Sequence, residues 1–276
     1  MNINSISSKP SLSSAQIPAV IQVTAADESG GVRTVEITGE YPLTLYVDGR
    51  EIVTLMTLGQ MPEALSVGWL RNQRLVSSIS DIEEVMVDWE VNSAAVYTRS
   101  GLVPLASKRT ITSGCGQGTM FGDLLEEVQE VNFVRSHSLT ATALAQLLED
   151  IRNRDTVYKS AGAVHACALA FFDGIGCAIQ IFVEDVGRHN AVDAIAGWMW
   201  INDVEGADCV FYTTGRLTSE MVVKCAQMKI PYLVSRSGLT RMGYEIAVAT
   251  GLTMFGRAVN RRYLLFTGGK HFVPER

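Results

Sequence analysis

The sequence lacks the marks of several protein classes. No stretch approaches the run of about 18 apolar residues that a membrane-spanning helix needs. The first 20 residues are rich in Ser, Asn and Pro and have no apolar centre of signal-peptide length. The net charge of −6 also lacks the positive excess of a duplex-binding protein. We therefore expect a cytoplasmic protein that binds neither a membrane nor nucleic acid.

The sequence is also poor in residues for disulfides or zinc. Its five cysteines are an odd number and lie far apart, which favours reduced thiols in a chain of this size. The four histidines are scattered and no Cys-x-x-Cys pair occurs, so the ligand spacing of a zinc site is absent. We expect no metal ligated by this chain.

The N-terminal part predicts a small α+β domain, residues 29–109. Apolar and β-branched residues alternate on both sides of Asp48 and Gly49, a dipeptide typical of hairpin turns. Apolar residues at helical spacing follow Pro62, which predicts a helix packed on the sheet of this hairpin. The preceding residues, 1–28, are expected to form a disordered tail.

The C-terminal part, residues 137–276, alternates between two patterns. Short runs of β-branched and apolar residues are followed by segments with helical spacing, from residue 163 to residue 258. This alternation predicts an α/β domain with helices on both faces of a mixed, largely parallel sheet. Between the two domains, residues 110–136 are expected to be a glycine-rich cysteine loop and linker.

Three loops at predicted strand ends each contain a Gly-Arg pair. They are "EDVGRHNAVD" at 184–193, "TTGRLTSE" at 213–220 and "MFGRAVNRR" at 254–262. Arginine binds phosphate with two hydrogen bonds, and a glycine turn into a helix offers free N–H groups to an anion. Taken singly, Arg188 could pair with Glu184 or Asp185, and Arg216 could pair with Glu220. Together, the three loops predict a nucleotide-like phosphate site.

Two histidines have an informative context. His165 follows small and apolar residues, a pattern more typical of a hydrogen-bonded imidazole in the core than of a catalytic residue. His189 stands at the start of a predicted helix, inside a charged loop. This position favours a role for His189 in the predicted site.

Cys115 differs from the other cysteines in its surroundings. It lies between Gly114 and Gly116 in "SGCGQG", where glycines leave the thiol uncovered and let N–H groups point at a sulfur anion. The other four lie in apolar runs typical of core residues: Cys167, Cys177, Cys209 and Cys225. We therefore expect Cys115 to attack a sulfur donor and to hold a sulfur atom.

Several segments carry a resemblance to a known family. They are "YPLTLYVDGREIVTLMT", "SGCGQG", "VHAC", "EDVGRHNAVD" and "TTGRLTSEMVVK". Together they resemble the FdhD family of formate dehydrogenase accessory proteins, which act as sulfur carriers. The resemblance covers roughly residues 35 to 265, and the ten-residue "EDVGRHNAVD" string is its most specific part.

The resemblance implies a C-terminal three-layer α/β/α domain of cytidine deaminase-like fold beside a smaller N-terminal α+β domain. It implies that Cys115 takes sulfur from a cysteine desulfurase as a persulfide. The sulfur would pass to the molybdenum bis(molybdopterin guanine dinucleotide) cofactor of formate dehydrogenase. The cofactor-contacting segment of the family falls on Phe255, Gly256, Arg257, Ala258, Val259, Asn260 and Arg261. Our phosphate-site prediction adds Arg188, His189 and Arg216. A homodimer is left open.

Two positions depart from the family pattern. Many members have Cys-Gly-x-Cys where this chain has Gly118, and the usual Gly-Gly before the histidine is Gly162-Ala163. Without a second thiol beside Cys115, a relay between two loop cysteines is not expected here. The zinc-binding motifs of cytidine deaminases are also absent. Two alternatives to the sulfur carrier are a non-catalytic chaperone that delivers the cofactor, with Cys115 as a contact, and a thiol-dependent nucleotide hydrolase.

Overall fold

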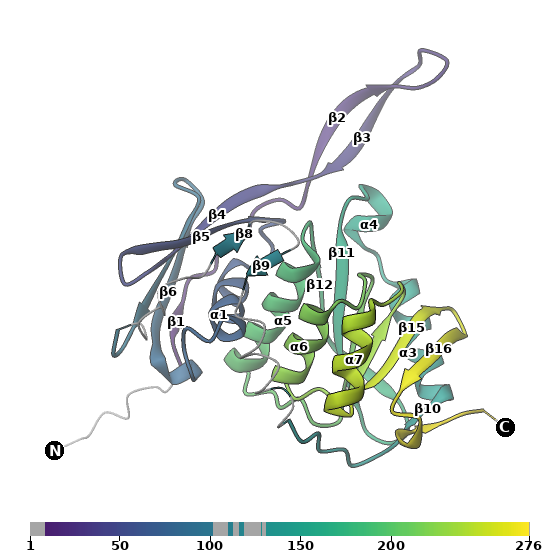
Figure 1. Cartoon of the computed structure of the whole chain (residues 1–276). Helices are drawn as coiled ribbons and strands as arrows, with labels where there is room; N and C mark the ends of the chain where they lie inside the picture. The colour runs from purple at the N-terminus through teal and green to yellow at the C-terminus, as the bar shows by residue number, and fades with distance from the viewer. Residues whose placement is uncertain (1–8, 102–109, 113–115, 119–127, 129–130, 276) are drawn as a thin grey trace.

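The structure is a computed structural model that describes residues 9–101, 110–112, 116–118, 128 and 131–275. An N-terminal part built on a five-stranded sheet lies beside a C-terminal part built on a six-stranded sheet (Figure 1). Helices α1 (Pro62–Asn72) and α5 (Arg188–Ile201) lie where the two parts meet. Among the described residues, no helix is long and apolar enough to cross a bilayer.

The N-terminal sheet has the strand order β1-β6-β7-β4-β5. Its elements are β1 (Ser11–Leu12), β4 (Tyr41–Val47), β5 (Arg50–Thr57), the 3-10 turn η1 (Ile79–Asp81), β6 (Ile82–Asp88) and β7 (Ser93–Thr98). Strands β4 and β5 form the predicted hairpin. Asp48 and Gly49 have φ values of 48° and 77°. Two positive φ values are those of a type I′ turn, which matches the twist of the strands.

Helix α1 forms where the spacing predicts it and contacts β6 and β7, but its closest neighbour is α5. A Cβ atom on Gly68 would lie 1.7 Å from the carbonyl oxygen of Asp193, and one on Gly197 would lie 1.9 Å from that of Ala64. The two backbones therefore touch at these glycines, where any side chain would hold them apart. This contact joins the N-terminal part to the C-terminal part.

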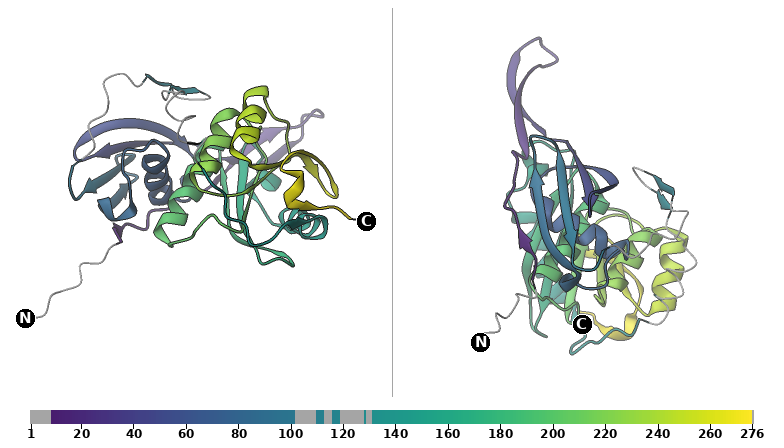
Figure 2. Two further views of the ribbon diagram at one scale, coloured as in Figure 1. Left: turned by 60° about the horizontal axis from the view of Figure 1, so that its bottom comes forward. Right: turned by 90° about the vertical axis from the view of Figure 1, so that its left-hand side faces the viewer.

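The expectation of a disordered tail over residues 1–28 is wrong from residue 9 onward. Strand β1 pairs in parallel with β6. Strand β2 (Val20–Ala26) pairs with β3 (Val32–Thr38) in a two-stranded ribbon that projects from the body (Figures 1 and 2). The polar residues before Val20 concealed a following strand, β2, that is rich in β-branched and apolar residues.

The C-terminal sheet has the order β12-β11-β13-β14-β15-β16. Its strands are β11 (His165–Phe172), β12 (Cys177–Asp185), β13 (Cys209–Thr213), β14 (Tyr232–Ser235), β15 (Thr253–Val259) and β16 (Arg262–Thr267). The sheet is mixed as predicted. The expectation that it is largely parallel is wrong, because β13 and β15 pair in parallel with β14 while β11, β12 and β16 join antiparallel.

Helices cover both faces of this sheet, which gives the predicted α/β/α layers. Helices α5, α6 (Ser219–Gln227) and α7 (Arg241–Thr250) pack on one face, and α3 (Ala141–Asn153) packs on the other. The remaining elements are β8 (Thr110–Thr112), β9 (Gly116–Gly118), β10 (Leu139–Thr140), α4 (Val157–Ser160), η2 (Gly269–His271) and β17 (Phe272–Val273). Each face of the sheet therefore has its own apolar core.

Candidate functional site

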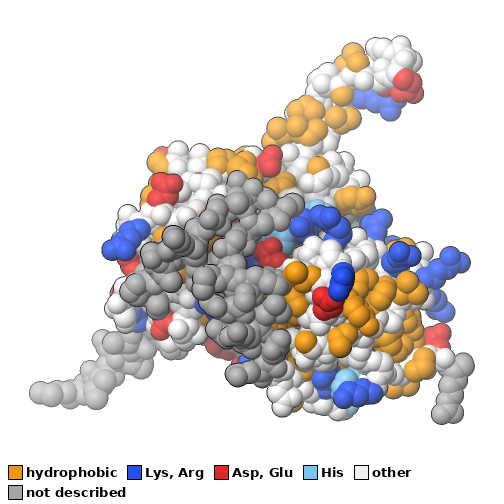
Figure 3. Space-filling model, viewed as in Figure 1, with side chains coloured by type: hydrophobic (Ala, Val, Ile, Leu, Met, Phe, Trp, Pro, Cys, Tyr) orange, Lys and Arg blue, Asp and Glu red, His pale blue; other side chains and the backbone are white. Residues whose placement is uncertain are grey.

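Two of the three Gly-Arg loops meet at one edge of the C-terminal sheet, where strands β12 and β13 end. The Cδ atom of Arg188 lies 3.1 Å from the place a Cβ on Gly215 would take, so the Arg188 side chain crosses this glycine. The positive charges of Arg188 and Arg216 help to lower the pKa of His165, after the larger effect of burial. The charges of Arg188 and Arg216 also lower the pKa of His189. We call these four residues the arginine–histidine cluster; Figure 3 shows basic and histidine atoms gathered at this edge.

The His189 side chain in this cluster is 16% exposed. Burial, and then the charge of Lys224, lowers the pKa of His189 to about 3. Among the described residues neither ring nitrogen has a hydrogen-bond partner, although Nδ1 lies 3.3 Å from Glu220 Oε1. His189 is therefore neutral at physiological pH and has hydrogen-bonding capacity left for a ligand.

The first turns of α5 and α6 adjoin the arginine–histidine cluster. Their N-caps are Gly187 and Thr218, and neither helix has a side-chain cap hydrogen bond. The hydroxyl of Thr218 is buried and, within the described part of the chain, has no partner. Glu220 lies near His189 and 3.5 Å from Lys224 Nζ, so the pairing with Arg216 considered from the sequence is not formed. Helix N-termini that have no side-chain cap and lie beside arginines favour an anion here.

Two carboxylates of "EDVGRHNAVD", Glu184 and Asp185, accept several hydrogen bonds each. Glu184 accepts hydrogen bonds from the N–H groups of Val157 and Tyr158, at 2.7 and 3.1 Å. Asp185 is 5% exposed and accepts hydrogen bonds from the Thr57 hydroxyl and from the N–H of Leu58, which belong to the N-terminal part. The two acids therefore position the loop that carries Arg188 and His189.

Asn190 and Asp193 make further links to the N-terminal part. Asn190 Nδ2 donates to the carbonyl of Met56 at 2.6 Å, and Asn72 Nδ2 donates to Asp193 at 2.6 Å. Lys224 Nζ lies 2.8 Å from the same Asp193, with both side chains at most 3% exposed. Asp185, Asn190 and Asp193 thus form an interdomain clasp. Sequence reasoning missed it because the partners lie more than 100 positions away.

A cavity of about 630 Å³ opens at the same sheet edge, on the side of α3. His165, Val259 and Asn260 line it, so it adjoins the arginine–histidine cluster and includes part of the predicted cofactor segment. The guanidinium of Arg236 lies 6.0 Å from the centre of the Tyr158 ring, and both line the cavity. Aromatic rings beside cations suit a planar, negatively charged ligand.

The other residues of the predicted cofactor segment lie either in the core or on a separate hollow. Phe255 is fully buried and packs edge-on against Tyr263 and Phe272, with ring centres 5.6 and 5.0 Å apart. Its side chain belongs to the core, Gly256 has no side chain, and the buried Ala258 lies in the same core beside the wall of the α3-side cavity. Arg257 and Arg261 line a separate hollow of about 650 Å³. Arg257 and Arg261 of the third Gly-Arg loop therefore line a different hollow from Val259 and Asn260 of the same loop, which line the cavity beside the arginine–histidine cluster.

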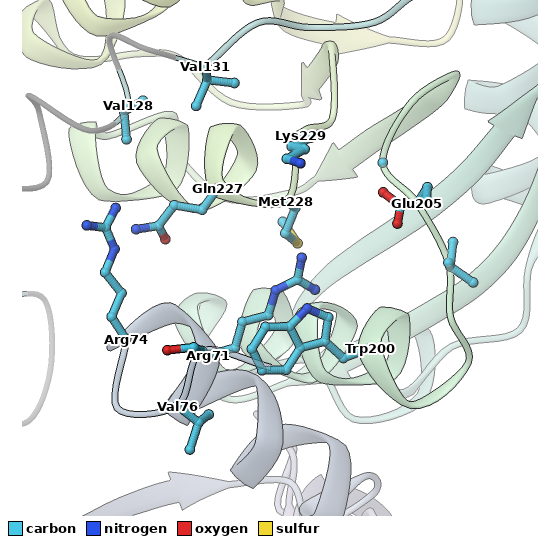
Figure 4. A pocket seen from close by; sticks show the side chains of 13 residues that line it. Arg71, Arg74, Val76, Val128, Val131, Trp200, Glu205, Gln227, Met228 and Lys229 are labelled. Atoms are coloured by element: carbon cyan, nitrogen blue, oxygen red, sulfur yellow. The ribbon is translucent and has the colours of Figure 1, made fainter. Parts of the chain in front are cut away.

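A further cavity, of about 540 Å³, lies between the ends of α1 and α5 (Figure 4). Arg71 enters it, donates to the carbonyl of Ala196 at 2.7 Å and lies 4.8 Å from the centre of the Trp200 ring. Burial lowers the pKa of Arg71 to about 10. His189 lies in the first turn of α5, about 17 Å from Trp200 at 1.5 Å per residue. This cavity is therefore separate from the arginine–histidine cluster.

The predicted nucleophile, Cys115, lies outside the described residues; the flanking strands β8 and β9 pair antiparallel, Thr112 opposite Gly116. The other four cysteines are buried. Burial raises the pKa of Cys167, Cys177 and Cys209 to about 12 and that of Cys225 well above its usual value. These four thiols are poor nucleophiles. The described residues also contain no group of His, Cys, Asp or Glu that could hold a metal ion.

Comparison with known proteins agrees with the sequence motifs. The sulfur carrier protein FdhD of Wolinella succinogenes is 28% identical over 231 residues, which cover 83% of this chain and 79% of the relative. The protein of the same name from Geobacillus kaustophilus is 28% identical over 235 residues, which cover 84% and 88%. Both therefore resemble this chain over most of its length.

A crystal structure from Desulfotalea psychrophila, assigned as a formate dehydrogenase accessory protein, has the same fold. Its TM-score is 0.75 at 24% identity, over 93% of this chain and 100% of the other. The sequence model of the FdhD/NarQ family matches residues 38–273, which include most of both parts of the structure and the arginine–histidine cluster. Since this match spans most of the sequence, the chain belongs to the FdhD/NarQ family.

Proposed function

We propose that this protein is a sulfur carrier that serves formate dehydrogenase and that Cys115 carries the sulfur as a persulfide. The names of the relatives, sulfur carrier protein FdhD, support the carrier role. A cytoplasmic location and the cytidine deaminase-like description of the C-terminal domain accompany this proposal as predictions.

The observation that carries the proposal is the burial of the other thiols. At a pKa of about 12 instead of the usual 9.0, the thiolate fraction of Cys167 at neutral pH falls about a thousandfold. The thiolate fractions of Cys177 and Cys209 fall by about the same factor, because burial raises their pKa values to about 12 as well. The pKa of Cys225 is also raised well above 9.0. Since the chain has five cysteines, Cys115 is left as the thiol for sulfur chemistry.

In the proposed loading step, the Cys115 thiolate attacks the outer sulfur of a persulfide on a cysteine desulfurase. The new S–S bond forms on Cys115 while the S–S bond of the desulfurase breaks, and the desulfurase thiolate leaves. One sulfur atom moves without any net oxidation. The S–S bond of the Cys115 persulfide then breaks as this sulfur, reduced to sulfide by two electrons from a dithiol reductant, passes to the molybdenum cofactor of formate dehydrogenase, which we treat as the substrate, and the Cys115 thiolate is regenerated.

We place the guanine dinucleotide of this cofactor across the α3-side cavity and the arginine–histidine cluster. The aromatic and cationic lining suits a guanine ring, with Val259 and Asn260 at its wall. Arg188, Arg216 and the neutral His189 would hold phosphate oxygens at the helix ends. Binding by Arg257 and Arg261 stays a prediction, since they face a separate hollow.

Intact-mass measurement distinguishes this carrier from the alternative of a chaperone that only delivers the cofactor. After incubation with a cysteine desulfurase and cysteine, the protein should gain about 32 Da, the mass of one sulfur atom, which a reductant removes. Cys115→Ala should gain nothing, and the matched control Cys225→Ala should load like the wild type. Absence of the adduct in the wild type, or its presence in Cys115→Ala, contradicts the proposal.

A further inference from the structure

The cavity between the ends of α1 and α5, which we call the junction cavity, holds a cation that no acid of the described residues pairs. The guanidinium of Arg71 lies in this cavity, next to Trp200 and pointing toward Met228 (Figure 4). Its one hydrogen bond in the described part of the chain goes to the carbonyl of Ala196. None of the ion pairs among the described residues includes Arg71.

A structural role accounts for only part of what Arg71 offers. Its hydrogen bond to Ala196 ties α1 to α5, and a cation near the C-terminal end of α5 suits the partial negative charge of that end. This role uses one N–H group, whereas a guanidinium carries several more. A cation that loses water without gaining a carboxylate is costly, and burial accordingly lowers the pKa of Arg71. The remaining N–H donors therefore point to a negatively charged ligand.

The other walls of the junction cavity suit an anion with an apolar body. Lys229, an exposed residue, brings a second positive charge and forms no ion pair with the described residues. Trp200, Val204 and Met228 supply apolar wall. Among the described lining residues the one acid is Glu205, which pairs with neither cation. At about 540 Å³, the cavity has the size of a small-molecule site.

Both parts of the protein contribute to the junction cavity. Arg71 belongs to α1 of the N-terminal part, whereas Trp200 lies in α5 and Lys229 follows α6 in the C-terminal part. A ligand that attracts both cations would therefore bridge the two parts. Because the unfolded chain does not bring these residues together, such a ligand would also stabilise the folded protein.

We propose that the junction cavity binds a small organic phosphate, a phosphate group on an apolar body. The phosphate dianion would take the unused N–H donors of Arg71, which suit paired phosphate oxygens, and its second charge matches that of Lys229. The apolar body would pack against Val204 and Met228. This site uses neither the arginine–histidine cluster nor Cys115, so it does not depend on the proposed sulfur chemistry.

Titration of the full chain with phenyl phosphate, followed by tryptophan fluorescence, tests this inference because Trp200 lines the cavity. The wild type should show saturable binding, and inorganic phosphate should bind about tenfold or more weakly, because it leaves the apolar wall unfilled. Arg71→Met should weaken phenyl phosphate binding at least about tenfold. The matched control is Arg241→Met, which removes an exposed arginine of α7 that pairs with Glu245 and should bind like the wild type.

Two variants of exposed residues decide the outcome if circular dichroism shows that Arg71→Met, which also loses the bond to Ala196, is unfolded. Lys229→Met should weaken binding, and Glu205→Gln should strengthen it about threefold, because a repelling charge is removed.

A purely structural Arg71 predicts no change in either variant, and that result would overturn the inference. So would a wild type that binds no phenyl phosphate, or that binds inorganic phosphate equally well. Loss of binding in Arg216→Ala instead would place the ligand at the arginine–histidine cluster and would also overturn it.

Discussion

Replacing Gly68 by Ala should separate the two parts of the protein. In an ordinary helix this change stabilises the chain by about 1 kcal/mol. Here the new Cβ would lie 1.7 Å from the carbonyl oxygen of Asp193, whereas ordinary contacts begin at 3.4 Å. Helices α1 and α5 would have to part by up to the difference, 1.7 Å. A gap of 0.5–1 Å already forfeits about a quarter to a half of the dispersion energy of the atoms involved.

We therefore expect Gly68→Ala to lower the free energy of unfolding by about 3 kcal/mol or more, at the upper end of overpacking effects. The same movement would stretch the 2.6 Å hydrogen bond between Asn72 and Asp193. Urea unfolding followed by tryptophan fluorescence measures the change in the free energy of unfolding, because Trp69 is buried in α1 and reports on its environment. Gly238→Ala, whose Cβ would meet nothing within 4 Å, should unfold like the wild type. Equal midpoints for Gly68→Ala and the wild type would refute the close helix contact.

Two further predictions concern the arginine–histidine cluster. The pKa of His189 is about 3 in the folded chain against the usual 6.5, so the unfolded chain binds the proton first as pH falls. Stability should therefore decline from about pH 6.5 toward pH 3, and His189→Gln should lessen the decline in urea unfolding; an unchanged pH profile contradicts this. Arg216→Ala should weaken guanosine diphosphate binding by about 1.5 to 3 kcal/mol in calorimetry, with sulfur loading unaffected; unchanged affinity would place the phosphates elsewhere.

Local signals predicted the elements best. The turn at Asp48 and Gly49 was predictable because few dipeptides adopt two positive φ values. Strand β16 was missed, because Arg262 and the neighbouring Arg261 mask the short apolar run that follows. The sheet was expected to be largely parallel because alternation along the chain does not reveal strand direction. In the structure β11 joins β13 antiparallel.

The candidate site was predictable only in part, because much of it depends on distant contacts. The sequence could place Arg188, His189 and Arg216 together, because the loops that follow the strands of an α/β sheet lie close together at the carboxyl ends of those strands. The structural role of Asp185 and Asp193 could not be predicted, because acidic residues in a charged loop resemble site residues until their partners, Thr57 of β5 and Asn72 of α1, are known. Arg257 lies within β15 of the same sheet and not in a loop at its end, and it lines a different hollow.

The central claim is that the Cys115 thiol itself carries sulfur to the cofactor. Formate dehydrogenase activity in cells whose own carrier has been deleted tests it most directly, with each variant supplied in trans. The account predicts that Cys115→Ala binds guanosine diphosphate normally but restores no activity, while Cys225→Ala restores activity to the wild-type level. Wild-type activity with Cys115→Ala would contradict the account and favour a chaperone that delivers the cofactor without sulfur transfer.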